Sequence, residues 1–220
     1  MFVDDCSRFT WIYPLHFKSE VYEKLLEFKA YAENQFHTSL KILRTDGGTE
    51  FVNKKVASLF FSHGIIYQAS CPYTQAQNGV AERKHRHITE TAITLLHQSS
   101  LPLKYWFDAV ATAIFLINRI PSSVLSNQSP FQILFKRLPD FSFFKVFGCQ
   151  CFPWLKPYTT HKLQPKSLSC VFLGYHPTVK GYRCLDPISG KLFVSQNVIL
   201  NESCFPFASS NLSSSSPPLF

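Results

Sequence analysis

The stretch Leu43-Arg44-Thr45-Asp46-Gly47-Gly48-Thr49-Glu50-Phe51 places an acidic residue and two glycines directly after a short apolar segment. Residues 39–45 are predicted to form a strand, so Asp46 is expected at its carboxyl end, the edge of an α/β sheet where sites are usually built. The glycines let the backbone turn away and leave room for a metal ion and a phosphate group. If Asp46-Gly47-Gly48 is considered alone, an ordinary aspartate in a turn is the simpler interpretation.

A second carboxylate, Glu82, is predicted in the first turn or two of a helix that follows a loop over residues 72–79 and ends near residue 98. Thirty-five residues separate it from Asp46. A strand end and a helix face can together present two carboxylates to Mg²⁺, which takes oxygen ligands in near-octahedral geometry. Such ions polarise a phosphate, activate the attacking hydroxyl and stabilise the leaving oxygen. The pair therefore predicts a site for Mg²⁺ (or Mn²⁺) in which Asp46 and Glu82 are catalytic and metal-binding residues.

These motifs resemble the integrase of a Ty1/copia-type retrotransposon, of the D,D-35-E class with a ribonuclease-H-like core. The resemblance rests on RTDGGTEF at 44–51, QNGVAERKHRHI at 77–88 and a downstream stretch that begins FGCQCFPWLKPY at 147. It covers residues 2–202 and departs from the family pattern at Gln75, where proline is usual. It also implies that a first catalytic acid lies on a strand before Phe2, so weak or no strand transfer is expected from this chain alone. Asp4 and Asp5 are less favoured replacements for that acid.

The resemblance implies DNA integration by two phosphoryl transfers, in which water trims the 3′ ends of the element and each new 3′-hydroxyl then attacks target DNA. The partners implied are the element ends and the target DNA, with a homo-oligomer for the complete protein. An intracellular, soluble location in the nucleus or a cytoplasmic particle is implied as well. The zinc-binding His-His-Cys-Cys module of such integrases has no counterpart in these residues.

Several residues near Glu82 are candidates for DNA contact. Asn78 has an amide suited to base edges or sugars, and it is equally suited to cap the following helix. Arg86 lies on the same helix face as Glu82, so it suits either DNA phosphates or an ion pair with Glu82. The predicted DNA-binding residues are Gln77, Asn78, Lys84, His85 and Arg86.

Composition agrees with a folded, nucleic-acid-binding protein. The 220 residues are 45% hydrophobic, enough for a packed core, and carry a formal net charge of +8 that suits a polyanionic partner. Residues 141–220 hold 7 Lys and Arg against 2 Asp and Glu. The longest apolar run, residues 109–117, is too short to span a bilayer, so we interpret it as part of a core helix and expect no membrane partner.

The seven cysteines match neither a zinc cluster nor a compact disulfide framework. Cys149 and Cys151 alternate as residues of a strand do, so both are expected on one side of a sheet. We favour a structural role over a metal role for them. Reduced thiols fit an intracellular compartment.

The order of predicted elements indicates an α/β core followed by short strands. The fold class expected is a ribonuclease-H-like integrase core lacking its first strand over residues 1–138, an SH3-like β-barrel over 139–203 and a disordered Ser/Pro-rich tail over 204–220. Because the missing strand is central in the family's sheet, a marginally stable core is expected. The predicted strands are 2–3, 9–17, 39–45, 65–70, 149–154, 169–175, 181–186 and 191–198, and the predicted helices are 20–36 with Ser19 as cap, 49–64, 79–98 and 103–118.

Two other functions stay open at this point. A non-catalytic DNA-binding protein would use the basic helix and the barrel without chemistry, and a pseudogene product would have no function. Five basic side chains are candidates to line a DNA path on the barrel, and five phenylalanines are expected in the core rather than stacked on bases. The basic candidates are Lys156, Lys162, Lys166, Lys180 and Arg183. The phenylalanines expected in the core are Phe141, Phe143, Phe144, Phe147 and Phe152.

Overall fold

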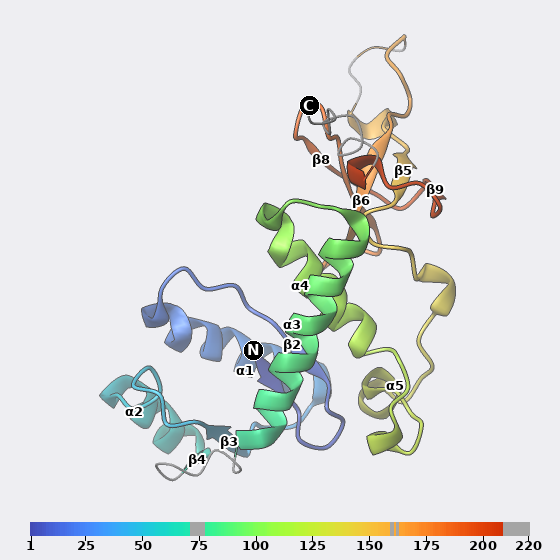
Figure 1. Cartoon of the computed structure of the whole chain (residues 1–220). Helices are drawn as coiled ribbons and strands as arrows, with labels where there is room; N and C mark the ends of the chain where they lie inside the picture. Colours follow the sequence, from blue (N-terminus) through green and yellow to red (C-terminus); the bar gives the residue numbers. More distant parts are fainter. Residues whose placement is uncertain (71–77, 159–160, 162, 209–220) are drawn as a thin grey trace, which may run out of the picture. The chain divides into compact units, whose positions relative to one another are not determined.

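The computed structural model describes residues 1–70, 78–158, 161 and 163–208. The chain forms two compact units (Figure 1), which we call the N-terminal unit (Met1 and residues 12–85) and the C-terminal unit (Phe2–Trp11 and residues from 86 onward). Residues 71–77, which include most of the predicted loop over 72–79, and residues 209–220 of the predicted tail lie outside the described residues. Residues 204–208 of that tail are described, and Cys204 is hydrogen-bonded to the backbone of Asn201 and Gln150 at 3.2 and 2.8 Å.

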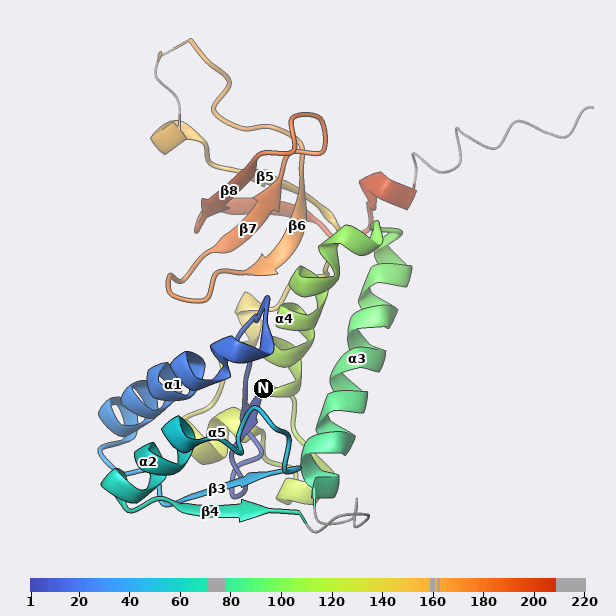
Figure 2. The same ribbon diagram turned by 90° about the vertical axis from the view of Figure 1, so that its left-hand side faces the viewer.

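The N-terminal unit contains a short parallel strand pair with two helices on one side of it (Figure 2). In the pair, Leu43 is opposite Tyr67 and Thr45 is opposite Ala69. Leu43 and Thr45 are buried whereas Ile42 and Arg44 are exposed, as the alternation of side chains along a strand requires. The elements are α1 (Val21–Phe36), β3 (Ile42–Thr45), α2 (Lys54–His63) and β4 (Ile66–Ala69).

Helix α1 begins without the side-chain cap that was predicted. Ser19 lies in a 3-10 helix over Lys18–Glu20, and the Glu20 carboxylate instead accepts hydrogen bonds from the N–H groups of His16 and Phe17 at 3.3 and 3.2 Å. The acid therefore satisfies the free N–H groups before the helix, and the prediction for Ser19 was wrong. Val21, Leu25 and Phe28 of this helix are buried, whereas Leu26 is 37% exposed.

Helix α2 begins five residues later than predicted. The Asn53 side chain accepts a hydrogen bond from Val56 N–H at 3.0 Å, which is the usual N-cap contact. Residues 49–52 form a turn before it. The predicted end is confirmed, because Gly64 adopts a φ of +64°, a conformation that glycine reaches without strain.

In the C-terminal unit, β1 (Phe2–Val3) and β2 (Thr10–Trp11) form an antiparallel pair in which Phe2 is opposite Trp11. The pairing was predicted, but the second strand is much shorter than 9–17. Pro14 follows closely, and a proline has no N–H to donate to a sheet. The same unit contains α3 from Arg86 onward, α4 and α5. Their full bounds are α3 (Gly79–Ser99), a 3-10 helix (Leu103–Tyr105), α4 (Trp106–Ile117) and α5 (Pro130–Phe135).

Helix α4 is the buried helix expected from the apolar run, since Ala109, Ala113, Ile114 and Ile117 are all buried. Helix α5 was not predicted. The Ser129 hydroxyl accepts from Gln132 N–H at 3.1 Å, and Pro130 stands at the first helical position. This start signal lies in a segment rich in Pro, Ser and Asn, for which no helix or strand was predicted.

The C-terminal sheet is antiparallel, with strand order β8-β7-β6-β5-β9. The predicted strand over 191–198 is wrong in one respect, because the chain turns at residues 196–197 and a separate strand then pairs with β5. At this turn Ser195 donates to the Asn197 carbonyl at 3.0 Å. The strands are β5 (Gln150–Pro153), β6 (Cys170–Tyr175), β7 (Tyr182–Leu185), β8 (Leu192–Ser195) and β9 (Val198–Asn201).

Four fully buried cysteines, together with Phe172, lie in the core of this sheet. Cys149 and Cys151 face the same interior, as their alternation predicted. Burial raises the pKa of the Cys149 and Cys170 thiols to about 12, so these thiols stay protonated and unreactive at neutral pH. The two others in the core are Cys151 and Cys184.

The predicted core phenylalanines divide into three groups. Phe147 is 2% exposed, whereas Phe141 is 51% exposed, so the prediction for Phe141 was wrong. The remaining three, Phe143, Phe144 and Phe152, are half-buried.

Candidate metal and nucleic-acid site

Asp46 follows β3 directly and is exposed. The preceding residue, Thr45, is buried, and its hydroxyl is hydrogen-bonded to the Tyr67 hydroxyl at 2.9 Å and accepts from Gly47 N–H at 3.1 Å. One Asp46 carboxylate oxygen accepts from Gly48 N–H at 3.2 Å. The backbone after β3 therefore holds one oxygen of this exposed carboxylate.

The glycine turn after Asp46 carries a further carboxylate whose position the sequence did not indicate. The Glu50 side chain folds back over Gly48, so that a Cβ at this glycine would lie 2.7 Å from a Glu50 oxygen. Gly47 adopts a φ of +79°, which favours glycine. The positive φ therefore explains Gly47, whereas at Gly48 an added Cβ would meet only the carboxylate end of the flexible Glu50 side chain.

Glu82 lies in the first turn of α3 and is exposed. Figures 1 and 2 show the carboxyl end of β3 and the first turn of α3 at the same end of the N-terminal unit. The two exposed carboxylates thus come from a strand end and a helix start, as predicted from the sequence. Their assignment as metal ligands stays a prediction.

The predicted DNA-binding residues follow the same helix start. Asn78 precedes α3 and is half-buried, as is Lys84, while His85 and Arg86 are exposed. Among the described residues, Arg86 forms no ion pair with Glu82. Gln77 lies outside the described residues.

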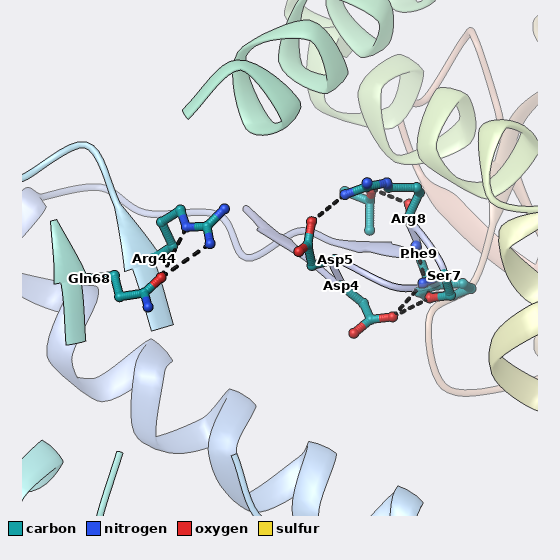
Figure 3. A network of polar contacts seen from close by, with 8 residues as sticks. Asp4, Asp5, Ser7, Arg8, Phe9, Arg44 and Gln68 are labelled. Carbon is teal, nitrogen blue, oxygen red and sulfur yellow. Dashed lines mark hydrogen bonds and ion pairs between the residues drawn. The ribbon is translucent and has the colours of Figure 1, made fainter. Parts of the chain in front are cut away.

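Arg44, interpreted from the sequence as a strand residue, lines an open hollow at the strand pair. Its Nε and Nη2 donate to the Gln68 Oε1 at 3.3 and 3.1 Å (Figure 3). The hollow measures about 580 Å³, and its lining also includes Tyr67, Ala69 and Ser70. No local sequence pattern could have indicated this contact, because Arg44 and Gln68 meet only through the parallel pairing of β3 and β4.

Asp4 and Asp5 are both engaged in the turn between β1 and β2 (Figure 3). Asp4 accepts from the N–H and the hydroxyl of Ser7 at 2.7 and 2.6 Å. Asp5 forms an ion pair with Arg8. These contacts stabilise a turn in which Arg8 has a φ of +60°, so the structure gives both acids a structural role.

The donors at Asp46 and Glu82 fit a hard divalent cation. Mg²⁺ in proteins is commonly bound by one or two carboxylates together with water and substrate phosphates. No group of three His, Cys, Asp or Glu side chains in the described part of the chain is arranged to hold a metal by itself. The described residues would therefore supply part of a coordination shell.

The basic side chains proposed for the barrel are not equally available. Arg183 forms an ion pair with Asp108 at 2.9 Å, and Lys180 forms a weaker one with Asp140 at 3.6 Å. Lys156 and Lys166 are exposed, and Lys162 lies outside the described residues. A continuous DNA path along these five residues is therefore not supported by their contacts.

Comparison with known proteins identifies the class. Residues 149–213 match the family described as the retroviral polymerase SH3-like domain. The chain is 47% and 46% identical, over 94% and 96% of its length, to the retrovirus-related Pol polyproteins from transposons RE1 and RE2 of Arabidopsis thaliana. It is 38% identical over 92% of its length to that from transposon TNT 1-94 of Nicotiana tabacum. The protein is therefore a retrotransposon Pol sequence.

More narrowly, the chain belongs to the copia-type Pol polyproteins, as a region with an integrase-like α/β core followed by a retroviral SH3-like domain. This confirms the predicted family and the predicted order of an α/β core followed by an SH3-like region. The chain spans 14–15% of the length of these three relatives.

Two solved integrase structures are also similar. The catalytic core domain of HTLV-2 integrase in complex with magnesium gives a TM-score of 0.46 at 20% identity, covering 60% of this chain and 80% of that one. The catalytic core domain of BIV integrase gives 0.41 at 21% identity, covering 57% and 76%. Because these values are low, the family assignment rests on the Pol polyproteins. None of the helices in the described part of the chain combines the length and hydrophobicity that a bilayer crossing needs.

Proposed function

We propose that this region of Pol acts in DNA integration, with Asp46 and Glu82 holding Mg²⁺ (or Mn²⁺) for 3′-end processing and strand transfer. The observation that carries the proposal is the exposed Asp46 carboxylate at the end of β3, on a base fixed by the hydrogen bonds of Thr45. An exposed acid on a rigid strand end suits metal binding, because a fixed ligand loses little entropy when the ion binds. Glu82 supplies the second carboxylate from α3.

Each nearby residue then has a distinct role. When bound, the metal ion would supply charge stabilisation at phosphate and activation of the attacking hydroxyl. Asp46 and Glu82 would bind the ion, and Arg44 would bind phosphate beside β3. Gln77, Asn78, Lys84, His85 and Arg86 would orient DNA along the start of α3. The nucleic-acid partners are the element ends and target DNA.

Further proposals concern organisation. We propose an integrase core over 1–138, an SH3-like module over 139–203 and a tail over 204–220, with a homo-oligomer for the complete protein. Its place of action would be the nucleus or a cytoplasmic particle.

Manganese binding measured by electron paramagnetic resonance tests the site without relying on turnover. Asp46→Asn and Glu82→Gln should each weaken Mn²⁺ binding at least tenfold. Glu90→Gln is the matched control, since Glu90 is exposed on the same helix two turns further on. Equal Mn²⁺ affinity in all three variants would remove the metal role.

A non-catalytic DNA-binding role is the second candidate. It is favoured by the incomplete ligand set among the described residues, which contain no group of three metal-binding side chains. It predicts salt-sensitive DNA binding that is unchanged in an Asp46→Asn, Glu82→Gln double variant, together with no Mn²⁺ binding.

A further inference from the structure

The chain between residues 109 and 139 carries three positive charges and no Asp or Glu. One of the cations lies just beyond α4 and two lie just beyond α5. The Phe131 N–H donates to the Asn118 carbonyl at 2.7 Å, which draws the start of α5 to the end of α4 within the C-terminal unit. This contact brings the cation after α4 close to those after α5. The three cations are Arg119, Lys136 and Arg137.

Two of these cations lie against the same aromatic ring. The Arg119 Cζ is 5.0 Å from the centroid of Phe131, and the Arg137 Cζ is 5.5 Å from it. Arg119 also lies 3.6 Å from the centroid of Phe115 and donates from Nη1 to the Phe115 carbonyl at 3.1 Å. We call Phe115, Arg119, Phe131 and Arg137 the arginine–aromatic cluster.

The cluster has an excess of positive charge. Neither guanidinium forms an ion pair with a carboxylate in the part of the chain that the structure describes. Desolvation lowers the pKa of Arg119 to about 10; Tyr175 opposes this shift and Arg137 adds to it. Arg119 therefore stays charged at neutral pH although it is half-buried and close to a second cation. Cation–π contacts offset only part of that cost.

An anion would complete this cluster. A guanidinium has five N–H donors in a planar fork, and the described hydrogen bond of Arg119 to Phe115 uses one of its nitrogens. Arg137 is exposed, so its fork is open to solvent. Contact with the aromatic rings fixes the orientation of both guanidinium groups before a ligand binds. A preorganised guanidinium loses less entropy when it binds phosphate oxygens.

We propose that Arg119 and Arg137 form a binding site for the phosphodiester backbone of duplex DNA, with Phe131 as the ring that holds the two guanidinium groups. The site reads no bases, because guanidinium–phosphate contacts position DNA without carrying sequence information. It rests on the proposed DNA-integration function and adds a contact surface in the C-terminal unit, separate from the carboxylates Asp46 and Glu82.

Fluorescence anisotropy with a labelled duplex and the full chain tests the site over a range of salt concentrations. Arg137→Gln removes one phosphate contact, so the slope of log affinity against log salt should fall by about 0.9, and affinity should fall about eightfold at 0.1 M salt. Arg137→Lys should keep the slope and lose part of the affinity, since a lysine keeps the charge but not the fork. Arg119→Lys should behave in the same way.

Lys104→Gln is the matched control. Lys104 is exposed and lies 5.0 Å from the centroid of the Tyr105 ring in the same unit, so this change also removes one cation stacked on an aromatic ring. Thermal melting verifies that every variant is folded. If Arg137→Gln shows the affinity and slope of Lys104→Gln, the cluster is structural and the proposal is overturned. An Asp46→Asn, Glu82→Gln double variant separates the two proposals, because it should lose Mn²⁺ binding and keep the salt slope.

Discussion

Asp108 on α4 and Arg183 on β7 form an ion pair of 2.9 Å inside the C-terminal unit. Only 13% of the Asp108 side chain and 24% of the Arg183 side chain are exposed. The contact joins Arg183 Nη2 to Asp108 Oδ1 but does not have hydrogen-bond geometry, and among the described residues neither Asp108 Oδ1 nor Arg183 Nε has a hydrogen-bond partner. A close but imperfect pair of this kind fixes the helix to the sheet without adding much net stability.

Replacing one partner of this pair should therefore destabilise the protein more than replacing both. Arg183→Met leaves the Asp108 carboxylate desolvated and unpaired, and we expect a loss of about 2–3 kcal/mol, below the range for fully buried pairs because Arg183 is partly exposed. The double variant Asp108→Leu, Arg183→Met should recover most of it. Urea unfolding of both variants measures the difference. A double variant less stable than Arg183→Met would contradict this reasoning.

The pH dependence of stability should follow the same carboxylate. Desolvation raises the pKa of Asp108, and this outweighs the opposing effect of Arg183. A raised pKa in the folded state means that the folded protein binds the proton more tightly than the unfolded chain. The contribution of Asp108 to stability is thus fully present below its ordinary pKa of 3.8 and is lost as pH rises through the raised value.

Asp108→Asn should accordingly be relatively more stable than the parent chain at neutral pH than in acid. The measurement is the difference in unfolding free energy between the two proteins from acid to neutral pH. Asp186→Asn is a useful comparison, because hydrogen bonds from Ser189 and Ile188 lower the pKa of Asp186 and the sign of its effect should be reversed. A difference for Asp108→Asn that does not change with pH would show that its desolvation has no energetic effect.

Gly174 on β6 approaches α4 more closely than any other residue type would allow. It has a φ of +102°, and an added Cβ would lie 2.2 Å from the Thr112 hydroxyl oxygen. Gly174→Ala should destabilise the C-terminal unit by about 2–3 kcal/mol through backbone strain and overlap. Gly190→Ala is the control, since Gly190 also has a positive φ but no atom within 4 Å, and should cost about 1 kcal/mol.

Thr112→Ala separates the two parts of that effect. The change removes the hydroxyl that the new methyl group would meet, so Gly174→Ala in a Thr112→Ala background should be less damaging than Gly174→Ala alone. Thermal unfolding of the three variants provides the comparison. Equal losses in both backgrounds would assign the whole effect to the backbone.

The sequence predicted those features whose signals are local. Gly64 marked the end of α2 because a helix stop favours glycine, and the alternation at Cys149 and Cys151 indicated that both face the same side of a sheet. Contacts between distant segments were missed. Arg44 meets Gln68 only through strand pairing, and Asp108 meets Arg183 across 75 residues (183 minus 108).

Local signals also failed where two of them competed. Ser19 is a good cap residue, but it lies inside a 3-10 helix, and Glu20 instead accepts from the N–H groups of His16 and Phe17 before it. The start of α2 was placed at Thr49 although Asn53 offers the better cap. At the candidate site, the strand end below Asp46 was predicted, whereas the position of Glu50 over Gly48 depends on side-chain packing within the turn.

The Asn53 cap gives a direct prediction for the N-terminal unit. Asn53→Ala should reduce stability by about 1 kcal/mol, because Val56 N–H then loses its acceptor. Asn53→Asp should keep most of the stability, since a carboxylate can also accept the Val56 N–H and its charge is stabilised at the positive end of the helix dipole. Asn34→Ala is the control, at an exposed position within α1. A loss at Asn53→Ala no larger than at Asn34→Ala would argue against the cap.

Asn118 gives the corresponding prediction for the C-terminal unit. It is 2% exposed, and its side-chain amide accepts from Thr10 N–H at 2.9 Å and donates to the Thr10 carbonyl at 2.8 Å. This reciprocal pair holds β2 to the end of α4, and no smaller side chain can form both bonds. Asn118→Ala should therefore cost about 2–3 kcal/mol, the cost of leaving two buried backbone groups unsatisfied.

Asn118→Asp distinguishes the two bonds. An ionised carboxylate can still accept from Thr10 N–H but cannot donate to the Thr10 carbonyl, so this variant should be destabilised at neutral pH and partly restored in acid, where the protonated group donates again. Amide hydrogen exchange at Thr10 measures the result directly. Slow exchange at Thr10 in Asn118→Ala would mean that other contacts hold β2 to α4.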